Sequence, residues 1–382
     1  MGNIFLSSFV IQAFTAAVGL FTIPLFAQIA GADELTQYLY IFSIASIASL
    51  IFSGISLSLS SSITERYDEG LNLLKIALLA LFAAVFITTQ FGIYWTSFPI
   101  IILTILITES TKGLSINSDQ FRSYQLLNLI CRTLVVGSMA LMLLIEIDFE
   151  LDFFDIVLIQ AIPAIFLGLR FLINISSKKF IIYSPISYYK NNSSLIFTRS
   201  IASGQEHFIR IALIALISSE LVVFYEFLNR LCRQTKGVFD NALSYLIREF
   251  ERESFIQLRF VVLGIIVLIV SFIIFSFFGG NDLIEYLLGF NLNINIVTVT
   301  LPFFCGYMLL LSTTVLMHYS AANNDFKIFL RISIIRMIAA IAILALMYGS
   351  FINFIGFIWL SSLVMSLIGV YTLWKLTKKM MI

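Results

Sequence analysis

Long hydrophobic runs separated by short polar segments make up almost the whole chain. Each run is about as long as the roughly 20 apolar residues that a helix needs to cross the hydrocarbon of a bilayer. In the first half the runs cover residues 4–30, 36–62, 74–96, 98–116, 124–145 and 153–174. In the second half they cover residues 194–218, 221–247, 258–279, 297–320, 327–349 and 351–375. Because lipid cannot satisfy open sheet edges, the pattern predicts an all-α polytopic membrane protein with about twelve transmembrane helices.

The polar segments between the runs alternate in the sign of their charge. Those after runs one, five, seven and nine are acidic and contain no Lys or Arg, as at Asp33 and Asp282. Those after runs two, four, six, eight and ten carry basic residues, as at Arg66 and Lys327. By the positive-inside rule, the basic segments and both termini are predicted to be cytoplasmic.

The longest basic segment, 176–192, lies at the middle of the chain. It predicts two six-helix lobes around a central cavity, an N-terminal lobe at 1–175 and a C-terminal lobe at 194–382, joined by a cytoplasmic linker at 176–193. DELTQYLY at 33–40 aligns with SELVVFYE at 219–226, each at the start of a second run. The match is short, so both an internal duplication and chance remain open.

Composition supports the membrane assignment and argues against a soluble domain and a disulfide-linked protein. Of 382 residues, 60% are hydrophobic and 12% are charged, whereas about a quarter of a soluble domain is charged. Cys131, Cys232 and Cys305 lie inside hydrophobic runs, so no disulfide framework is expected. The N-terminus lacks the basic region and cleavage site of a signal peptide, so residues 4–30 are predicted to be the first span.

Charged residues inside the runs are the main functional signal, because each costs roughly 2.5–3.5 kcal/mol at the bilayer centre. In run eight, an arc of roughly 120° around the helix holds Glu226, Arg230, Arg233, Lys236 and Asp240. In run seven, Arg199, Glu206 and Arg210 follow one stripe, and His207 is next to it. The other runs add Glu109, Lys112, Arg132 and Arg336.

These twelve charges contain four more cations than anions. Some are expected to form buried ion pairs, for instance Glu206 with Arg210 or Glu226 with Arg230. Internal pairing cannot neutralise the surplus, and a guanidinium binds phosphate bidentately. The sequence therefore favours an anionic ligand, a phosphate or pyrophosphate, over a cationic drug.

No motif for other chemistry stands out. The chain has no G-x-x-x-x-G-K-[ST] nucleotide loop, and His207 and His318 are its only histidines, too few for a metal site of usual spacing. We therefore predict no cofactor, no metal and no nucleic-acid partner. Energy input is expected from an ion gradient, the membrane voltage or the substrate gradient. Glu206 beside His207 is a candidate for ion coupling, and a plain hydrogen-bonded buttress is the open alternative.

Three stretches resemble the O-antigen and polysaccharide translocases of the multidrug/oligosaccharidyl-lipid/polysaccharide flippase superfamily. The stretch at 19–43, GLFTIPLFAQIAGADELTQYLYIFS, has that family's pattern at Pro24, Gly31, Glu34 and Tyr38. The others are SDQFRSYQLLNLICRTLVVGSMALMLL at 118–144 and ALISSELVVFYEFLNRL at 215–231. The resemblance covers essentially the whole chain as a pattern of spans.

The resemblance implies a flippase of the bacterial inner membrane. It would move undecaprenyl-pyrophosphate-linked oligosaccharide from the cytoplasmic to the periplasmic leaflet by alternating access. Arg210, Arg230 and Arg233 would meet the pyrophosphate, with Arg132 and Arg336 as further candidates. Membrane lipid and the polymerase and chain-length proteins of the same pathway would be its partners.

Two alternatives stay open. A polytopic polysaccharide polymerase would be an enzyme of the same pathway, but such enzymes tend to carry a large outward loop, and the longest one here, 280–296, is short and apolar. A secondary transporter of another lipid-linked anion would have the same sequence features. We expect a transporter and not an enzyme.

Overall fold

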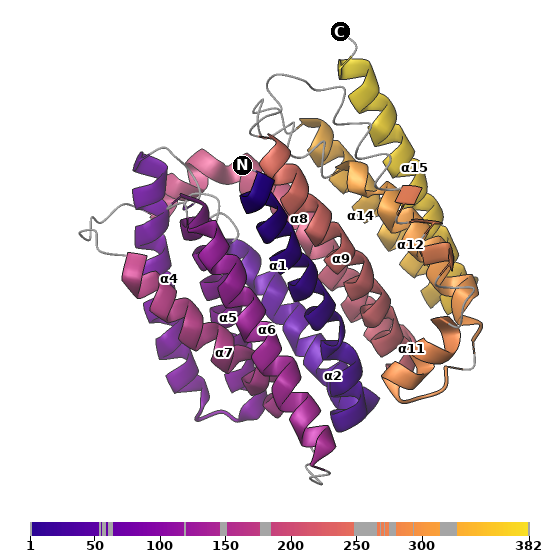
Figure 1. The fold of residues 1–382 in the computed structure, drawn as a ribbon, viewed down its shortest axis with the longest axis horizontal. Helices are drawn as coiled ribbons and strands as arrows, with labels where there is room; N and C mark the ends of the chain where they lie inside the picture. The colour runs from indigo at the N-terminus through magenta and orange to yellow at the C-terminus, as the bar shows by residue number, and fades with distance from the viewer. Residues whose placement is uncertain are drawn as a thin grey trace. The chain divides into compact units, whose positions relative to one another are not determined.

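The computed structural model describes residues 2–52, 55, 59, 64–117, 120–145, 151–175, 185–247, 266, 267, 269, 270, 272–274, 280–292, 294–313 and 327–380. The α-helices are α1 (Gly2–Leu20), α2 (Thr22–Ser49), α4 (Thr64–Thr88), α5 (Ile93–Asn117), α6 (Phe121–Leu144), α7 (Phe153–Ile175), α8 (Pro185–Leu216), α9 (Ser219–Ile247), α11 (Gly280–Leu288), α12 (Ile296–Leu309), α14 (Lys327–Tyr348) and α15 (Phe354–Met380). A 3-10 turn, η1, covers Leu50–Phe52. Figure 1 shows these helices, and the predicted all-α fold is confirmed.

The helices follow the hydrophobic runs. Within the described residues, eight helical segments are long and apolar enough to cross a membrane. Helices α8 and α9 match runs seven and eight in position, but neither is among the segments that are apolar enough to cross a membrane. They carry most of the charged residues that lie inside the hydrophobic runs. Most of run nine, 258–279, lies outside the described residues. The cytoplasmic placement of both termini remains a prediction.

The first span contains a break that the hydrophobic pattern did not predict. Helix α1 ends at Leu20, and the Phe21 amide donates to the Val18 carbonyl at 3.2 Å. Pro24 explains the break, because it has no amide hydrogen to bond the carbonyl four residues earlier, at Leu20. A second break follows at Gly31, with φ 82° and ψ 168°, a conformation that glycine adopts without a Cβ penalty. It separates the first predicted span from the second.

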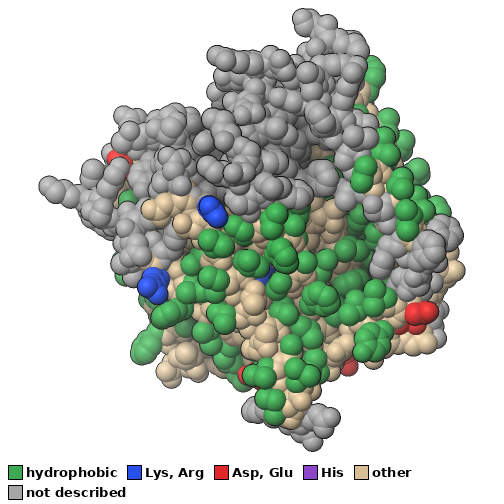
Figure 2. Space-filling view, viewed as in Figure 1, with side chains coloured by type: hydrophobic (Ala, Val, Ile, Leu, Met, Phe, Trp, Pro, Cys, Tyr) green, Lys and Arg blue, Asp and Glu red, His purple; other side chains and the backbone are tan. Residues whose placement is uncertain are grey.

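The described chain forms two compact units, and each is described by itself. One unit comprises Leu25–Ile211. In it α5 packs against α4, α6 and α7 (Figure 1). Leu103, Ile107 and Val157 are buried between these helices. Phe86 and Phe166 are 76% and 68% exposed, as expected of side chains that face lipid. Among the described side chains on the face drawn in Figure 2, hydrophobic ones predominate and the charged ones stand apart from one another.

Helix α2 is tied to the start of α7 through Glu34. Its carboxylate accepts a hydrogen bond from the Phe153 amide at 3.0 Å. Asp152 accepts from the amides of Phe154 and Asp155, at 2.8 and 3.0 Å. Acceptors and negative charge at a helix N-terminus satisfy its unpaired amides and its dipole. Glu34 is thus a cap for α7 supplied by another helix.

Replacing Glu34 by alanine is expected to lower the free energy of unfolding by about 1 kcal/mol, because one amide of α7 loses its acceptor. Titration of the purified protein with SDS in mixed micelles, followed by circular dichroism, measures this. Asp33→Ala is the matched control, because Asp33 is the neighbouring exposed carboxylate. Equal losses in the two variants would contradict the capping role.

The other unit comprises Met1–Pro24 and Ala212–Ile382. Helix α9 packs against α1 and α12, and α15 packs against α12 and α14. The ring of Tyr225 on α9 meets Phe303 on α12 and Phe357 on α15 edge-on, at 5.8 and 6.1 Å between centroids. Gly306 and Gly369 allow α12 and α15 to approach so closely that their backbones touch. Aromatic contacts and small residues together close this core.

Two helices occupy segments that the sequence predicted to be loops. Helix α8 begins at Pro185, inside the predicted linker 176–193, and proline is favoured in the first helical turn. Helix α11 lies inside the predicted outward segment 280–296. Residues 176–184 lie outside the described part, and the two lobes at 1–175 and 194–382 remain a prediction.

Candidate functional site

The predicted site residues lie on four helices. Glu206, His207 and Arg210 are on α8, Arg230 and Arg233 on α9, Arg132 on α6, and Arg336 on α14. Those on α8 and α6 belong to the unit Leu25–Ile211, and those on α9 and α14 belong to the other unit. The geometry is therefore given within each unit.

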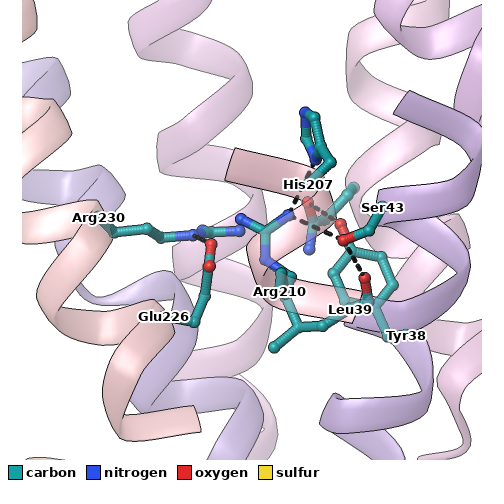
Figure 3. Close-up of polar contacts among 8 residues, drawn as sticks. Tyr38, Leu39, Ser43, His207, Arg210, Glu226 and Arg230 are labelled. Carbon is teal, nitrogen blue, oxygen red and sulfur yellow. Dashed lines mark hydrogen bonds and ion pairs between the residues drawn. The ribbon is translucent and has the colours of Figure 1, made fainter. Parts of the chain in front are cut away.

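Arg210 is buried, with only 1% of its surface exposed. Its Nη1 donates to Ser43 Oγ on α2 at 3.0 Å and lies 3.1 Å from Nδ1 of His207 (Figure 3). Its Cζ atom lies 5.8 Å from the centroid of the Phe42 ring, close enough for a cation–π contact. We call Arg210, His207, Ser43, Phe42 and Tyr38 the Arg210 cluster.

The chemistry of these groups fixes their hydrogen-bond roles. Ser43 Oγ donates its proton to the Leu39 carbonyl at 2.7 Å, which leaves its lone pairs for Arg210 (Figure 3). A guanidinium has donors only, so Nδ1 of His207 must be the acceptor in its contact with Arg210. His207 is therefore neutral in this arrangement, with its proton on Nε2.

Aromatic side chains extend the cluster along α2 towards α7. The Phe42 ring contacts the rings of His207 and Tyr38, at 5.9 and 5.7 Å between centroids. Tyr38 is buried, and its hydroxyl donates to Oε1 of Gln160 on α7 at 2.9 Å. The cluster thus connects α8 through α2 to α7.

Glu226 and Arg230 form an ion pair on α9. Arg230 Nε donates to Glu226 Oε1 at 3.3 Å, and the side chains are 3% exposed for Glu226 and 20% for Arg230 (Figure 3). They are four residues apart, so they lie on adjacent turns of one face. The ion-pair interpretation from the sequence is confirmed here. Arg210 contacts Ser43, His207 and the Phe42 ring, and its pairing with Glu206 stays a prediction.

The remaining site residues differ in exposure. Arg233 is exposed, whereas Arg132, Arg336 and Glu206 are half-buried. The structure thus brings Arg210 together with His207, and Arg230 together with Glu226. Arg132 and Arg336 belong to different units. The side chains of Arg199 and Asp240 lie outside the description.

A cavity of about 540 Å³ lies in the unit that contains α9, and none of the predicted site residues lines it. It is lined by Leu216, Ile217, Ser218, Leu221, Ile294, Met347, Ser350, Ile352, Asn353, Phe354 and Ile355. None of these side chains is charged, so this cavity is not built for a phosphate. In the described part of the chain, no group of three His, Cys, Asp or Glu residues is placed to hold a metal.

The sequence did not single out Ser43, Phe42 or Gln160. A serine in a run of small residues is typical of helix packing, and nothing local shows which arginine it meets. His207 and Arg210 did carry a signal, because residues three apart on a helix are neighbours. The contact from α2 to α8 depends on the tertiary fold alone.

No protein-family model and no curated protein matches the chain. Solved structures of similar fold do exist. An inward-facing multidrug resistance MATE family transporter of the MOP superfamily is 10% identical, covers 97% of this chain and 94% of its own, and has a TM-score of 0.60. The MATE multidrug transporter DinF-BH is 12% identical, with 98% of this chain and 94% of its own covered and a TM-score of 0.60.

A third similar structure is a MOP superfamily transporter from Pyrococcus furiosus, described as having a binding pocket of reversed polarity that suggests a different function. It is 10% identical over 98% of this chain and 95% of its own, with a TM-score of 0.59. Apolar helices of spanning length and this likeness support a multi-pass membrane protein. The chain has the fold of the MATE transporters of the MOP superfamily.

Proposed function

We propose that the protein is a membrane transporter that flips a lipid-linked anion, with undecaprenyl-pyrophosphate-linked oligosaccharide as its substrate. Movement from the cytoplasmic to the periplasmic leaflet of a bacterial inner membrane would occur by alternating access. The likeness to solved transporters supports the transport function, and the arginines support the charge of the substrate. The resemblance of the sequence to O-antigen and polysaccharide translocases supports the choice of lipid.

The observation that carries this proposal is the exposure of Arg233. Helix α9 covers Ser219–Ile247, and Arg233 is its middle residue. An exposed arginine at the centre of a membrane helix is costly unless it faces water or an anion. Asn229 and Glu226, one and two turns away, are buried. Arg233 is thus positioned to present a guanidinium to a ligand.

The other four arginines would contact the substrate less directly than Arg233. Arg230 is held by Glu226 and is one turn from Arg233, so it can share a pyrophosphate with Arg233. Arg210 would bind a phosphate of the substrate through its guanidinium. Arg132 and Arg336 are half-buried and would be secondary contacts. A cationic drug would be repelled by these side chains.

The test measures which leaflet holds the lipid. Proteoliposomes containing the purified protein and a fluorescent polyprenyl pyrophosphate with one sugar are treated with a membrane-impermeant quencher. The intact protein should equilibrate the lipid between leaflets, and Arg233→Ala should slow this at least about ten-fold, a loss of about 1.4 kcal/mol. Arg233→Lys should recover part of the rate.

Arg331→Ala is the matched control, because Arg331 is an exposed arginine of α14 that has no proposed role. Equal flipping by Arg233→Ala and the intact protein would refute the assignment of Arg233. Equal rates for a lipid phosphate without sugar would favour another lipid-linked anion as substrate. In a null strain, lipid-linked repeat units that accumulate on the outside would favour a polymerase.

We further propose that His207 takes part in ion coupling, with Glu206 as the adjacent carboxylate. A proton taken up at Nδ1 of His207 cannot coexist with the hydrogen bond from Arg210. Glu206 precedes His207 on α8, and Arg210 Nη1 lies 3.1 Å from Nδ1 of the imidazole. Proton binding would therefore change the position of Arg210.

A further inference from the structure

The cavity of about 540 Å³ has no part in the proposed function, yet its volume is typical of small-molecule sites. Two turns of the chain meet at it, the α8–α9 turn at 217–218 and the α14–α15 turn at 349–353. Helices α14 and α15 are both long and apolar enough to cross a membrane, so the turn at 349–353 marks the end of two spans. The cavity therefore lies where the hydrocarbon of the bilayer meets its polar layer.

The lining of the cavity is amphipathic. The helices contribute apolar side chains, among them Leu221, Met347 and Ile355. The turns contribute neutral polar side chains, which are Ser218, Ser350 and Asn353. Asn353 Oδ1 accepts a hydrogen bond from the Gly356 amide at 2.9 Å, a bond that does not use the two donors on Nδ2. The polar end of the cavity thus offers hydrogen-bond donors without charge.

The backbone at Ser350 carries a strain that the end of helix α14 does not require. The amides of Ser350 and Phe351 donate to the carbonyls of Met347 and Leu346, each at 3.0 Å. This capping pattern needs one residue in the left-handed conformation, a place where glycine is usual. Here it is Ser350, with φ 60°. Serine is less stable than glycine in that conformation, and what it adds is a hydroxyl that lines the cavity.

We propose that the cavity binds one acyl chain of a bilayer phospholipid, whose ester carbonyl accepts hydrogen bonds from Ser350 and Asn353. The chain is apolar, and its carbonyl is a neutral acceptor at the level where the hydrocarbon ends, so both match the lining. None of the described residues that line the cavity is charged, so a phosphate finds no cation there. A polyprenyl chain has no carbonyl and would leave the donors unmatched.

The test uses a phosphatidylcholine with a diazirine in one acyl chain. The full chain is photolabelled in detergent micelles over a range of probe mole fractions, and labelled peptides covering 216–221 and 347–355 are quantified by mass spectrometry. Ser350→Gly removes the hydroxyl and relieves the backbone, so the half-saturating mole fraction should rise about five-fold, as loss of one neutral hydrogen bond implies. Ser350→Asn is the matched control, because asparagine tolerates the left-handed conformation and keeps a donor. It should be labelled like the intact protein.

Two further comparisons separate the cavity from the outer surface and the acyl chain from other chains. Ile355→Trp fills the cavity and should abolish saturable labelling, whereas Ile338→Trp, at a position of α14 that is 62% exposed, should leave it unchanged. An ether-linked probe has the same chain without the carbonyl and should need about five-fold more for half-saturation.

Three results would overturn the acyl-chain site. They are equal half-saturation of the intact protein and Ser350→Gly, equal half-saturation by the ester and ether probes, and saturable labelling by a diazirine polyprenyl phosphate but not by the phospholipid. The Ser350→Gly comparison needs no cavity-filling variant, so it decides the matter even if Ile355→Trp does not fold. None of the arginines of the proposed function lines the cavity, so the loss of this site would leave that function standing.

Discussion

Replacing Arg230 by methionine is expected to lower the free energy of unfolding by about 3 kcal/mol. The substitution keeps Glu226, whose side chain is 3% exposed, and removes the guanidinium that pairs with it at 3.3 Å. Breaking a buried ion pair by removing one partner costs more than replacing both, because a charge stays in a poorly solvated place. SDS titration of the purified protein measures the loss.

The double variant Glu226→Leu with Arg230→Met is the matched comparison. It removes both charges, so we expect it to recover most of the lost stability. Arg331→Met controls for loss of an exposed arginine. Equal stability of the single and double variants would contradict the pairing. Transport assays of Arg230 variants are therefore informative only when folding is measured beside them.

Replacing Gly369 by alanine is expected to destabilise the unit that contains α12 and α15 by about 3 kcal/mol. A Cβ at Gly369 would lie 2.5 Å from the Leu309 carbonyl oxygen and 2.6 Å from its carbon. Both atoms are backbone, so no side chain can turn away, and the two helices must separate. The same SDS titration tests this, and Gly306→Ala should behave alike, because its Cβ would lie 2.7 Å from the Ser362 carbonyl oxygen.

Gly237→Ala is the control in the same unit. No atom lies within 4 Å of a Cβ at that position, and Gly237 is inside helix α9. Alanine there should be neutral or stabilise by about 0.5–1 kcal/mol, since glycine weakens a helix interior. A loss at Gly237 as large as that at Gly369 would show that close packing is not the cause.

Much of the fold could be predicted from the sequence because lipid imposes a simple rule. Hydrophobic length alone predicted the helices α5, α6 and α7 within about five residues, whereas α4 begins and ends before the predicted run 74–96. It could not predict the break at Phe21, which depends on one missing amide at Pro24. Helices α8 and α9 were also found as hydrophobic runs, at 194–218 and 221–247, although both contain several charged residues.

The site was predicted less completely, for a physical reason. Helical spacing showed that Glu226 can pair with Arg230, and that pair is present. Spacing says nothing about contacts between helices, so the sequence could not offer Ser43 as a partner of Arg210. Exposure also depends on packing, which is why Arg230 and Arg233 differ although they share a face.

Helix α2 is attached to α7 at two points. Glu34 binds the first residue of α7, and Tyr38, one turn later on α2, binds Gln160, two turns later on α7. Two anchors on one helix pair fix both its rotation and its register, so this part of α2 and α7 move as one rigid block. Ser43 is on that block. The hydrogen bond from Arg210 to Ser43 therefore attaches α8 to this block, and a movement of α8 away from α2 must break it.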